Sequence, residues 1–142
     1  MKDAFGGLFN IVVIGAFLML LSSTFALIVS YTKAFKFKNI VISNYEKYEA
    51  ANCEGLSGGS ACSDNISKEA KSIAYSPNTT VKCHDGMELD SNGLFCYRPI
   101  VQKNGVIYEV VIQIDINFPL VNRLVAMRVF QVSGKTRVIV KR

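Results

Sequence analysis

The sequence is poor in the residue types from which most enzyme and metal sites are built. Among 142 residues there is one histidine, His84, and no tryptophan. A single imidazole, together with four cysteines that form no C-x-x-C pair, argues against a zinc site, a dithiol redox centre and a histidine-based triad. No glycine-rich phosphate loop occurs. We therefore expect no enzymatic activity, no metal and no cofactor.

The acidic residues do not suggest a metal site either. Asp85, Glu88 and Asp90 lie close together, but a calcium loop needs regularly spaced ligands closed by a late bidentate glutamate. This stretch lacks that spacing, so we interpret it as a solvated turn.

Positive charge is in modest excess, +5 at neutral pH, and is spread along the chain. Such a distribution predicts no nucleic-acid partner. A basic end is formed by Lys135, Arg137, Lys141 and Arg142. These residues either protect an exposed strand edge from aggregation or contact an anionic surface.

Charge is absent altogether from residues 8–32, which are mostly apolar. As a helix this segment measures about 37 Å, enough to cross a hydrocarbon core of about 30 Å with some tilt. It is too long for the apolar region of a signal peptide, and Tyr31 and Lys33 stand where interfacial anchors are common. We expect residues 1–33 to be a retained transmembrane anchor and residues 34–142 to form one domain outside the bilayer.

All four cysteines follow this anchor, which indicates two disulfides formed in an oxidising compartment. Three pairings are possible. We favour Cys53–Cys62, which closes a glycine-rich loop, and Cys83–Cys96, which lie on either side of an Asn-Gly turn signal.

The orientation of the chain rests on two opposing signals. Lys33, Lys36 and Lys38 follow the anchor, and the positive-inside rule would place them in the cytoplasm. Disulfides require the opposite orientation. We give the cysteines more weight and expect a single-pass protein of the cell membrane with an extracytoplasmic domain.

Small residues recur on one side of the anchor, which is typical of helices that pack closely in lipid. They favour association with other helices in a bilayer or a filament; the alternative is the ordinary tolerance of membrane helices for small side chains. The residues are Gly15, Ser22, Ala26 and Ser30.

The helix is expected to continue beyond the membrane, to about Ala51, because no proline or glycine interrupts residues 17–50. Phe37, Val41, Tyr45 and Tyr48 fall on one face of this continuation. We expect this apolar stripe to pack on the protein's own sheet; a partner surface is the alternative.

The remaining sequence predicts a second helix over residues 63–74 and an antiparallel meander with one wet face that includes Gln113. Residues 133–135 are interpreted as a turn. The fold class is therefore α+β, a long helix packed on a small sheet. The expected strands are residues 79–84, 94–101, 106–117, 124–132 and 136–141.

This layout resembles the type IV pilins, and within them the TadE-like minor pilins and pseudopilins of Gram-positive tight-adherence systems. The opening GGLFNIVVIGAFLMLL, the cysteine pairs and the closing INFPLVNRLVAMRVFQVSGKTRVIV carry the resemblance. It implies a structural subunit of a surface filament or secretion apparatus, with the membrane and other pilin-like subunits as partners. Pilins of this kind are processed after a glycine and carry glutamate at the fifth mature position; counted from Gly7, that position is Val12. A membrane-anchored binding or adhesion module is the alternative.

Overall fold

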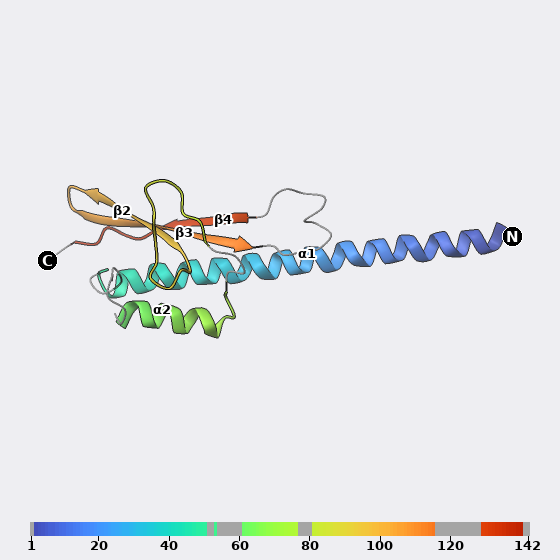
Figure 1. Cartoon of the computed structure of the whole chain (residues 1–142), viewed down its shortest axis with the longest axis horizontal. Helices are drawn as coiled ribbons and strands as arrows, with labels where there is room; N and C mark the ends of the chain where they lie inside the picture. The colour runs from blue at the N-terminus through green and yellow to red at the C-terminus, as the bar shows by residue number, and fades with distance from the viewer. Residues whose placement is uncertain (1, 51–52, 54–60, 77–80, 116–128, 141–142) are drawn as a thin grey trace.

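The computed structural model describes residues 2–50, 53, 61–76, 81–115 and 129–140. Within them, one long helix and one short helix accompany a four-stranded antiparallel sheet, so the α+β class is confirmed and the layout is consistent with a pilin-like fold (Figure 1). The helices are α1 (Lys2–Lys47) and α2 (Ala61–Ser72), and the strands are β1 (Glu88–Leu89), β2 (Cys96–Gln102), β3 (Gly105–Asp115) and β4 (Val129–Lys135).

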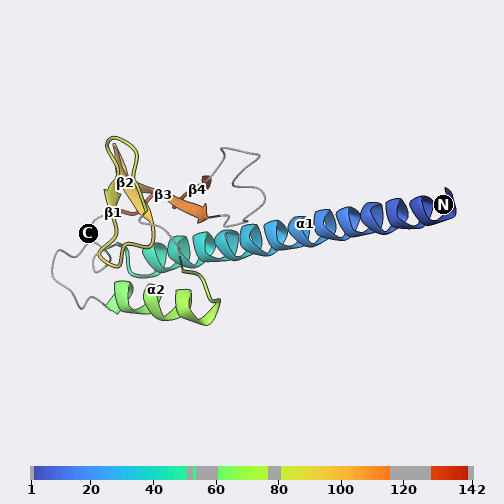
Figure 2. The ribbon, with the colours of Figure 1, turned by 45° about the vertical axis from the view of Figure 1, so that its right-hand side comes forward.

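Helix α1 dominates the shape of the molecule. Its 46 residues correspond to about 69 Å of helix. The C-terminal half lies along the sheet, and the N-terminal half projects away from the domain (Figures 1 and 2). The helix ends at Lys47, earlier than expected, because Glu49 and Ala50 adopt left-handed backbone angles and the Ala50 amide donates to the Tyr45 carbonyl.

The sheet is a meander, as predicted, with strand order β1-β2-β3-β4. A tight hairpin joins β2 to β3, where Gln102 faces Gly105. Val110, Ile112 and Ile114 of β3 are buried, which confirms the apolar side expected for this strand, but Val111 is buried as well.

The expected strand 79–84 is wrong for residues 81–84, which form no strand; residues 79 and 80 lie outside the described part of the chain. Strand β1 pairs with β2 instead, across a turn in which the Gly93 amide donates to the Asp90 carbonyl (2.8 Å). Residues 81–84 are held to the sheet by a side chain and not by a neighbouring strand. The Gln113 side chain accepts from the Lys82 backbone amide (3.3 Å) and donates to the Lys82 carbonyl. Gln113 is consequently buried and not on a wet face.

The expectations for residues 129–140 also need correction. Strand β4 continues through residues 133–135, where a turn was expected. A Cβ added at Gly134 would lie 2.7 Å from the Cδ1 atom of Ile42, so this glycine permits close approach of α1. Beyond it, the expected strand 136–141 is reduced within the described residues to one bridge between Ile139 and Val106. The expected strand 124–132 begins with residues 124–128, which lie outside the described part of the chain.

The core lies between α1 and the inner face of the sheet. Phe37, Val41 and Tyr45 are fully buried, and Tyr48 packs partly buried at its edge. The Tyr45 ring lies 5.2 Å from that of Tyr108, centroid to centroid. The apolar stripe expected from the sequence therefore packs within the chain.

Candidate functional site: the exposed apolar half of the helix

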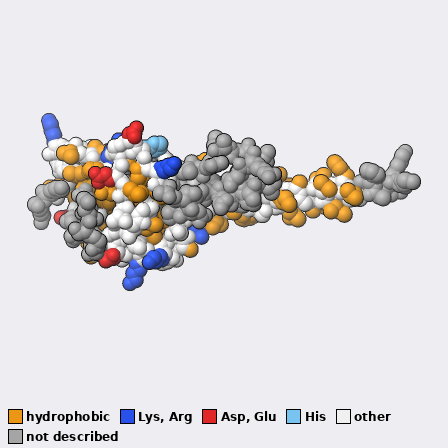
Figure 3. Space-filling view, viewed as in Figure 1, with side chains coloured by type: hydrophobic (Ala, Val, Ile, Leu, Met, Phe, Trp, Pro, Cys, Tyr) orange, Lys and Arg blue, Asp and Glu red, His pale blue; other side chains and the backbone are white. Residues whose placement is uncertain are grey.

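The N-terminal half of α1 exposes large apolar side chains on all sides. Leu8, Phe9 and Ile11 are each about two-thirds exposed or more, and the pattern continues to Tyr31. Figure 3 shows this apolar surface along the projecting rod. Apolar patches of such extent mark membrane or protein contacts. By length and composition, this helix is able to cross a membrane.

Three consecutive hydroxyl groups in this half are satisfied by the helix itself. Ser22 donates to the Met19 carbonyl (3.0 Å), Ser23 to the Leu20 carbonyl (2.9 Å) and Thr24 to the Leu21 carbonyl (2.8 Å). Lipid offers no hydrogen-bond partners, so polar side chains in a spanning helix must bond internally. These residues therefore suit an apolar environment.

The small residues singled out by sequence extend from the projecting half of α1 to the point where the helix meets the sheet. Ser22 is exposed, and Gly15, Ala26 and Ser30 are half-exposed. A Cβ added at Gly15 would meet nothing within 4 Å. Within the described part of the chain, no other element thus packs against Gly15.

A groove lies where α1 leaves the sheet, and sequence reasoning did not find it. Its volume is about 360 Å³, and its walls are Leu27, Ile28 and Tyr31 of α1 with Ile114 and Phe130 of the sheet. Ile114 and Phe130 face each other across β3 and β4. The only sequence signal was that Phe130 continues the inward alternation of Val132.

A basic and aromatic belt follows the uncharged segment directly. Lys33 is half-exposed and Lys36 is exposed. The Lys38 amine lies 4.1 Å from the centroid of the Phe35 ring, and the Tyr31 and Phe35 rings are 6.5 Å apart. Such belts are typical of the boundary between a membrane and water.

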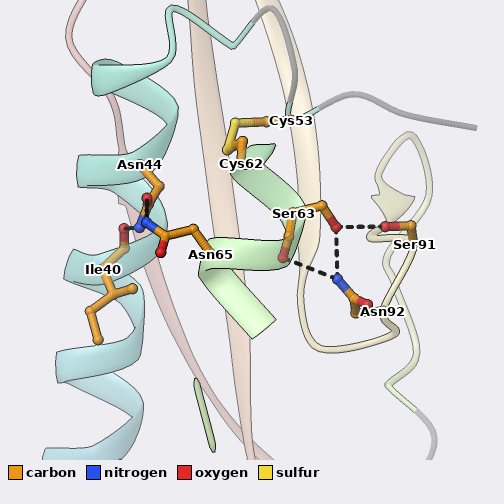
Figure 4. Close-up of a disulfide and its surroundings, with 8 residues drawn as sticks. All are labelled: Ile40, Asn44, Cys53, Cys62, Ser63, Asn65, Ser91 and Asn92. Carbon is orange, nitrogen blue, oxygen red and sulfur yellow. Dashed lines mark hydrogen bonds between the residues drawn. A yellow bond between two sulfur atoms is a disulfide. The ribbon is translucent and has the colours of Figure 1, made fainter. Parts of the chain in front are cut away.

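Both favoured disulfides are present. Cys53 bonds to Cys62, with Cα atoms 5.0 Å apart, and Cys83 bonds to Cys96, with Cα atoms 5.6 Å apart. The first joins the chain after α1 to the start of α2 (Figure 4). The second joins the segment before β1 to β2, so each bridge ties a segment outside the helices and strands to a regular element.

A polar network fixes α2 between α1 and the β1–β2 turn (Figure 4). On one side Asn65 donates to the Asn44 side-chain oxygen (2.9 Å), while Asn44 donates to the Ile40 carbonyl (2.9 Å). On the other side the Asn92 amide donates to the Ser63 hydroxyl (2.8 Å). The polar groups of this network bond to one another and so have a structural role. The exposed apolar half of α1 therefore stays the candidate functional surface.

The acidic and histidine side chains considered above do not converge. Glu88 accepts from the Tyr97 hydroxyl (2.9 Å), and His84 Nε2 lies 3.2 Å from the side-chain oxygen of Gln131. Among the residues that the structure describes, no three histidine, cysteine or acidic side chains form a metal-binding group.

Asp90 gives a testable pH dependence. Burial raises its pKa, while hydrogen bonds from Asn92 and Ser91 oppose the rise. A carboxyl whose folded-state pKa exceeds its unfolded value of about 3.9 contributes its full stabilisation at pH values below the unfolded value. This contribution is lost as pH rises through the folded-state pKa. Asp90→Asn should therefore gain stability relative to wild type between acidic and neutral pH, measured by denaturant unfolding. The exposed Asp85→Asn control should show no such gain, and equal behaviour of both variants would contradict the prediction.

The basic end is partly neutralised. The Lys135 amine lies 3.9 Å from Glu109, which also pairs with Arg98. Arg137 lies 3.8 Å from Glu46, and its backbone amide donates to the same carboxylate (2.8 Å). Lys141 and Arg142 lie outside the described residues. Contact of this end with an anionic surface stays a prediction.

The chain matches no protein-family model, no curated protein and no solved structure. The functional assignment therefore rests on the fold and on the surface of α1.

Proposed function

We propose that this protein is a structural, pilin-like subunit, of the TadE-like minor pilin kind, in a cell-surface filament or secretion apparatus. One observation carries the proposal. A single helix is fully integrated into the domain core at Phe37, Val41 and Tyr45, yet exposes apolar side chains throughout its other half. Such a helix needs an apolar surrounding that its own domain does not supply.

Two surroundings can cover the same surface in turn. Residues 8–32 have the length to cross a bilayer, which would hold the subunit before assembly. In a filament, neighbouring helices would replace lipid against the strip formed by Gly15, Ser22, Ala26 and Ser30, because small side chains let helix backbones approach closely. The domain keeps its own core in both states.

The disulfides support an extracytoplasmic domain. Cys53–Cys62 and Cys83–Cys96 account for all four cysteines of the chain. Structural disulfides form and persist outside the reducing cytoplasm. The protein would thus have its N-terminus inside and its domain outside, at the cell membrane or in a surface filament.

A second candidate is a membrane-anchored binding or adhesion module that never leaves the bilayer. It is favoured by the residue at the fifth position after Gly7, which is Val12, and by the absence of any glutamate before Glu46. The carboxylate that resembling pilins use to pair with a neighbouring N-terminus has no counterpart in the apolar segment.

Cross-linking tests whether the small-residue strip is an assembly surface. Ala26→Cys adds one thiol on the strip, and Thr24→Cys adds one on the opposite side of α1. We expect a bis-maleimide to cross-link Ala26→Cys into dimers several times more efficiently than Thr24→Cys, because only the strip would face a neighbouring helix. The native cysteines are all in disulfides and would not react.

The location of the cross-linked species separates the two candidates. Cross-linked Ala26→Cys in the sheared surface fraction supports a filament subunit. Retention of the entire protein with the membrane supports the anchored module. Equal cross-linking of the two variants would contradict assembly through this strip, and a bulky Ala26→Leu substitution should abolish assembly while leaving both native disulfides intact.

A further inference from the structure

We propose that the groove between α1 and the end of the sheet binds the acyl chains of membrane phospholipid, so that the domain is seated in the outer leaflet and not held above it. The groove is lined by Leu27, Ile28, Tyr31, Ile114 and Phe130. All five side chains present apolar surface, and the groove is open. The inference rests on the proposed function in one respect only, that α1 spans the membrane.

The position of the groove along α1 supports lipid as its occupant. Lys33 is the first charged residue after the uncharged segment, and Leu27 precedes it by about 9 Å along the helix axis. The groove therefore lies on the membrane side of the first charge. Residues 8–26 still provide about 28 Å of helix, close to the thickness of a hydrocarbon core.

The sheet contributes an unclosed end of the core to this groove. Inward-facing Ile112 and Val132 are buried, but the next residue in line on β4, Phe130, is 46% exposed. Its cross-strand partner Ile114 is buried. Among the residues that the structure describes, the apolar layer between helix and sheet thus opens toward the level at which the bilayer begins, where lipid would cover it.

A charge on the groove side of α1 favours a phospholipid with an anionic headgroup. Lys38 follows Tyr31 by seven residues, which is about two turns and 10 Å along the helix, so the two residues share a face. The Lys38 side chain also lies beside Gly134 of β4, the strand that carries Phe130. A lipid whose chain lies against Tyr31 and Ile28 would carry its phosphate toward this amine. Amines beside an apolar surface attract anionic lipids.

A helix from a second copy fits the groove less well. Leu27 to Tyr31 is only about 6 Å of α1, little more than one turn. Helices pack through ridges and grooves that extend over several turns. A flexible acyl chain fits a contact of this length.

The absence of tryptophan allows a direct test. Phe130→Trp places a single fluorophore in the groove, from the sheet side. Val101→Trp places one at the β2–β3 hairpin, where Val101 is 81% exposed, and Leu18→Trp places one within the uncharged segment. The full chain is inserted into nanodiscs that contain phospholipids brominated on their acyl chains, which quench tryptophan on contact.

We expect Phe130→Trp to be quenched at least half as strongly as Leu18→Trp, and Val101→Trp to stay at background. Quenching of Phe130→Trp no stronger than that of Val101→Trp would overturn the proposal. If Leu18→Trp is strongly quenched in that case, the spanning helix survives and only the groove assignment fails. If Leu18→Trp is not quenched, the membrane-spanning state of the proposed function fails as well.

Two further arms identify the occupant. Quenching of Phe130→Trp should be the same with one copy per disc as with several; a signal that requires several copies would overturn lipid in favour of a second chain. Brominated phosphatidylglycerol should quench more than brominated phosphatidylcholine, and Lys38→Gln should remove the difference. Equal quenching by the two lipids would overturn the headgroup contact. Intact mass should show both disulfides in every variant, which verifies the fold.

Discussion

Phe37→Ala is expected to lower the free energy of unfolding by about 3–5 kcal/mol, the range for truncating a fully buried aromatic side chain. Phe37 is 0% exposed. Its ring stacks on that of Tyr75 at 4.4 Å between centroids and meets the Phe95 ring edge-on at 6.1 Å. One side chain thus joins α1 to the segment after α2 and to the residue before β2. Denaturant unfolding in detergent micelles, followed by tyrosine circular dichroism, measures the loss.

Phe35→Ala supplies the matched control two residues earlier on the same helix. Phe35 is 43% exposed and contacts the Lys38 amine. Its truncation removes less buried area, so we expect a loss of under about 1 kcal/mol. Similar losses for the two variants would mean that α1 does not dock on the sheet through the Phe37 face.

The Phe37 face was predictable because its signal is local. Phe37, Val41 and Tyr45 recur at the helical period, and nothing in the intervening sequence ends a helix. The disulfide pairing was predictable for a related reason. Each bridge closes a short stretch of chain, 9 residues for Cys53–Cys62 and 13 for Cys83–Cys96, so the loop composition indicated which sulfurs meet.

Gly134 shows where local signals fail. A glycine between strand-like segments is typical of a turn, but it is equally typical of a strand that another element approaches closely. Only the position of Ile42, far away in the sequence, decides between the two. The expected turn and closing strand were wrong for that reason.

The prediction that Gln113 faces solvent was wrong for a similar reason. In an alternating strand a polar residue predicts a wet face. Here the side chain bonds the backbone of Lys82 and is buried. A buried amide that satisfies another segment's backbone has the same sequence pattern as a solvated one, so the cover over this face of the sheet was not predictable.

The groove could not be found from sequence because its walls come from two distant regions. Leu27 and Tyr31 look like ordinary residues of a spanning helix. Ile114 and Phe130 look like ordinary strand residues. Their convergence depends on how far along α1 the sheet extends, and no local pattern encodes that distance.

Removing the Cys83–Cys96 bridge is the second large change. A double Cys83→Ser, Cys96→Ser variant should lose about 3 kcal/mol, since the bridge closes a 13-residue separation in the unfolded chain. Cys96 is buried with Val81 and Val111, so serine there adds an unfavourable polar group. Unfolding of the variant and of the wild type under non-reducing conditions gives the difference. If the variant is as stable as the wild type, the bridge contributes nothing to the domain.

The same pair of sulfurs tests the orientation of the protein, on which the proposed function depends. A domain outside the cytoplasm keeps Cys83–Cys96 oxidised, so a membrane-impermeant maleimide should label intact cells only after an external reductant is added. A domain inside would hold free thiols that the reagent reaches only after lysis. A loss of about 3 kcal/mol is a large part of the 5–15 kcal/mol that stabilises a typical domain. A cytoplasmic location, which the positive-inside rule favours for Lys33 and Lys36, would therefore deprive this fold of a large part of its stability, and labelling only after lysis is the result that would support that location.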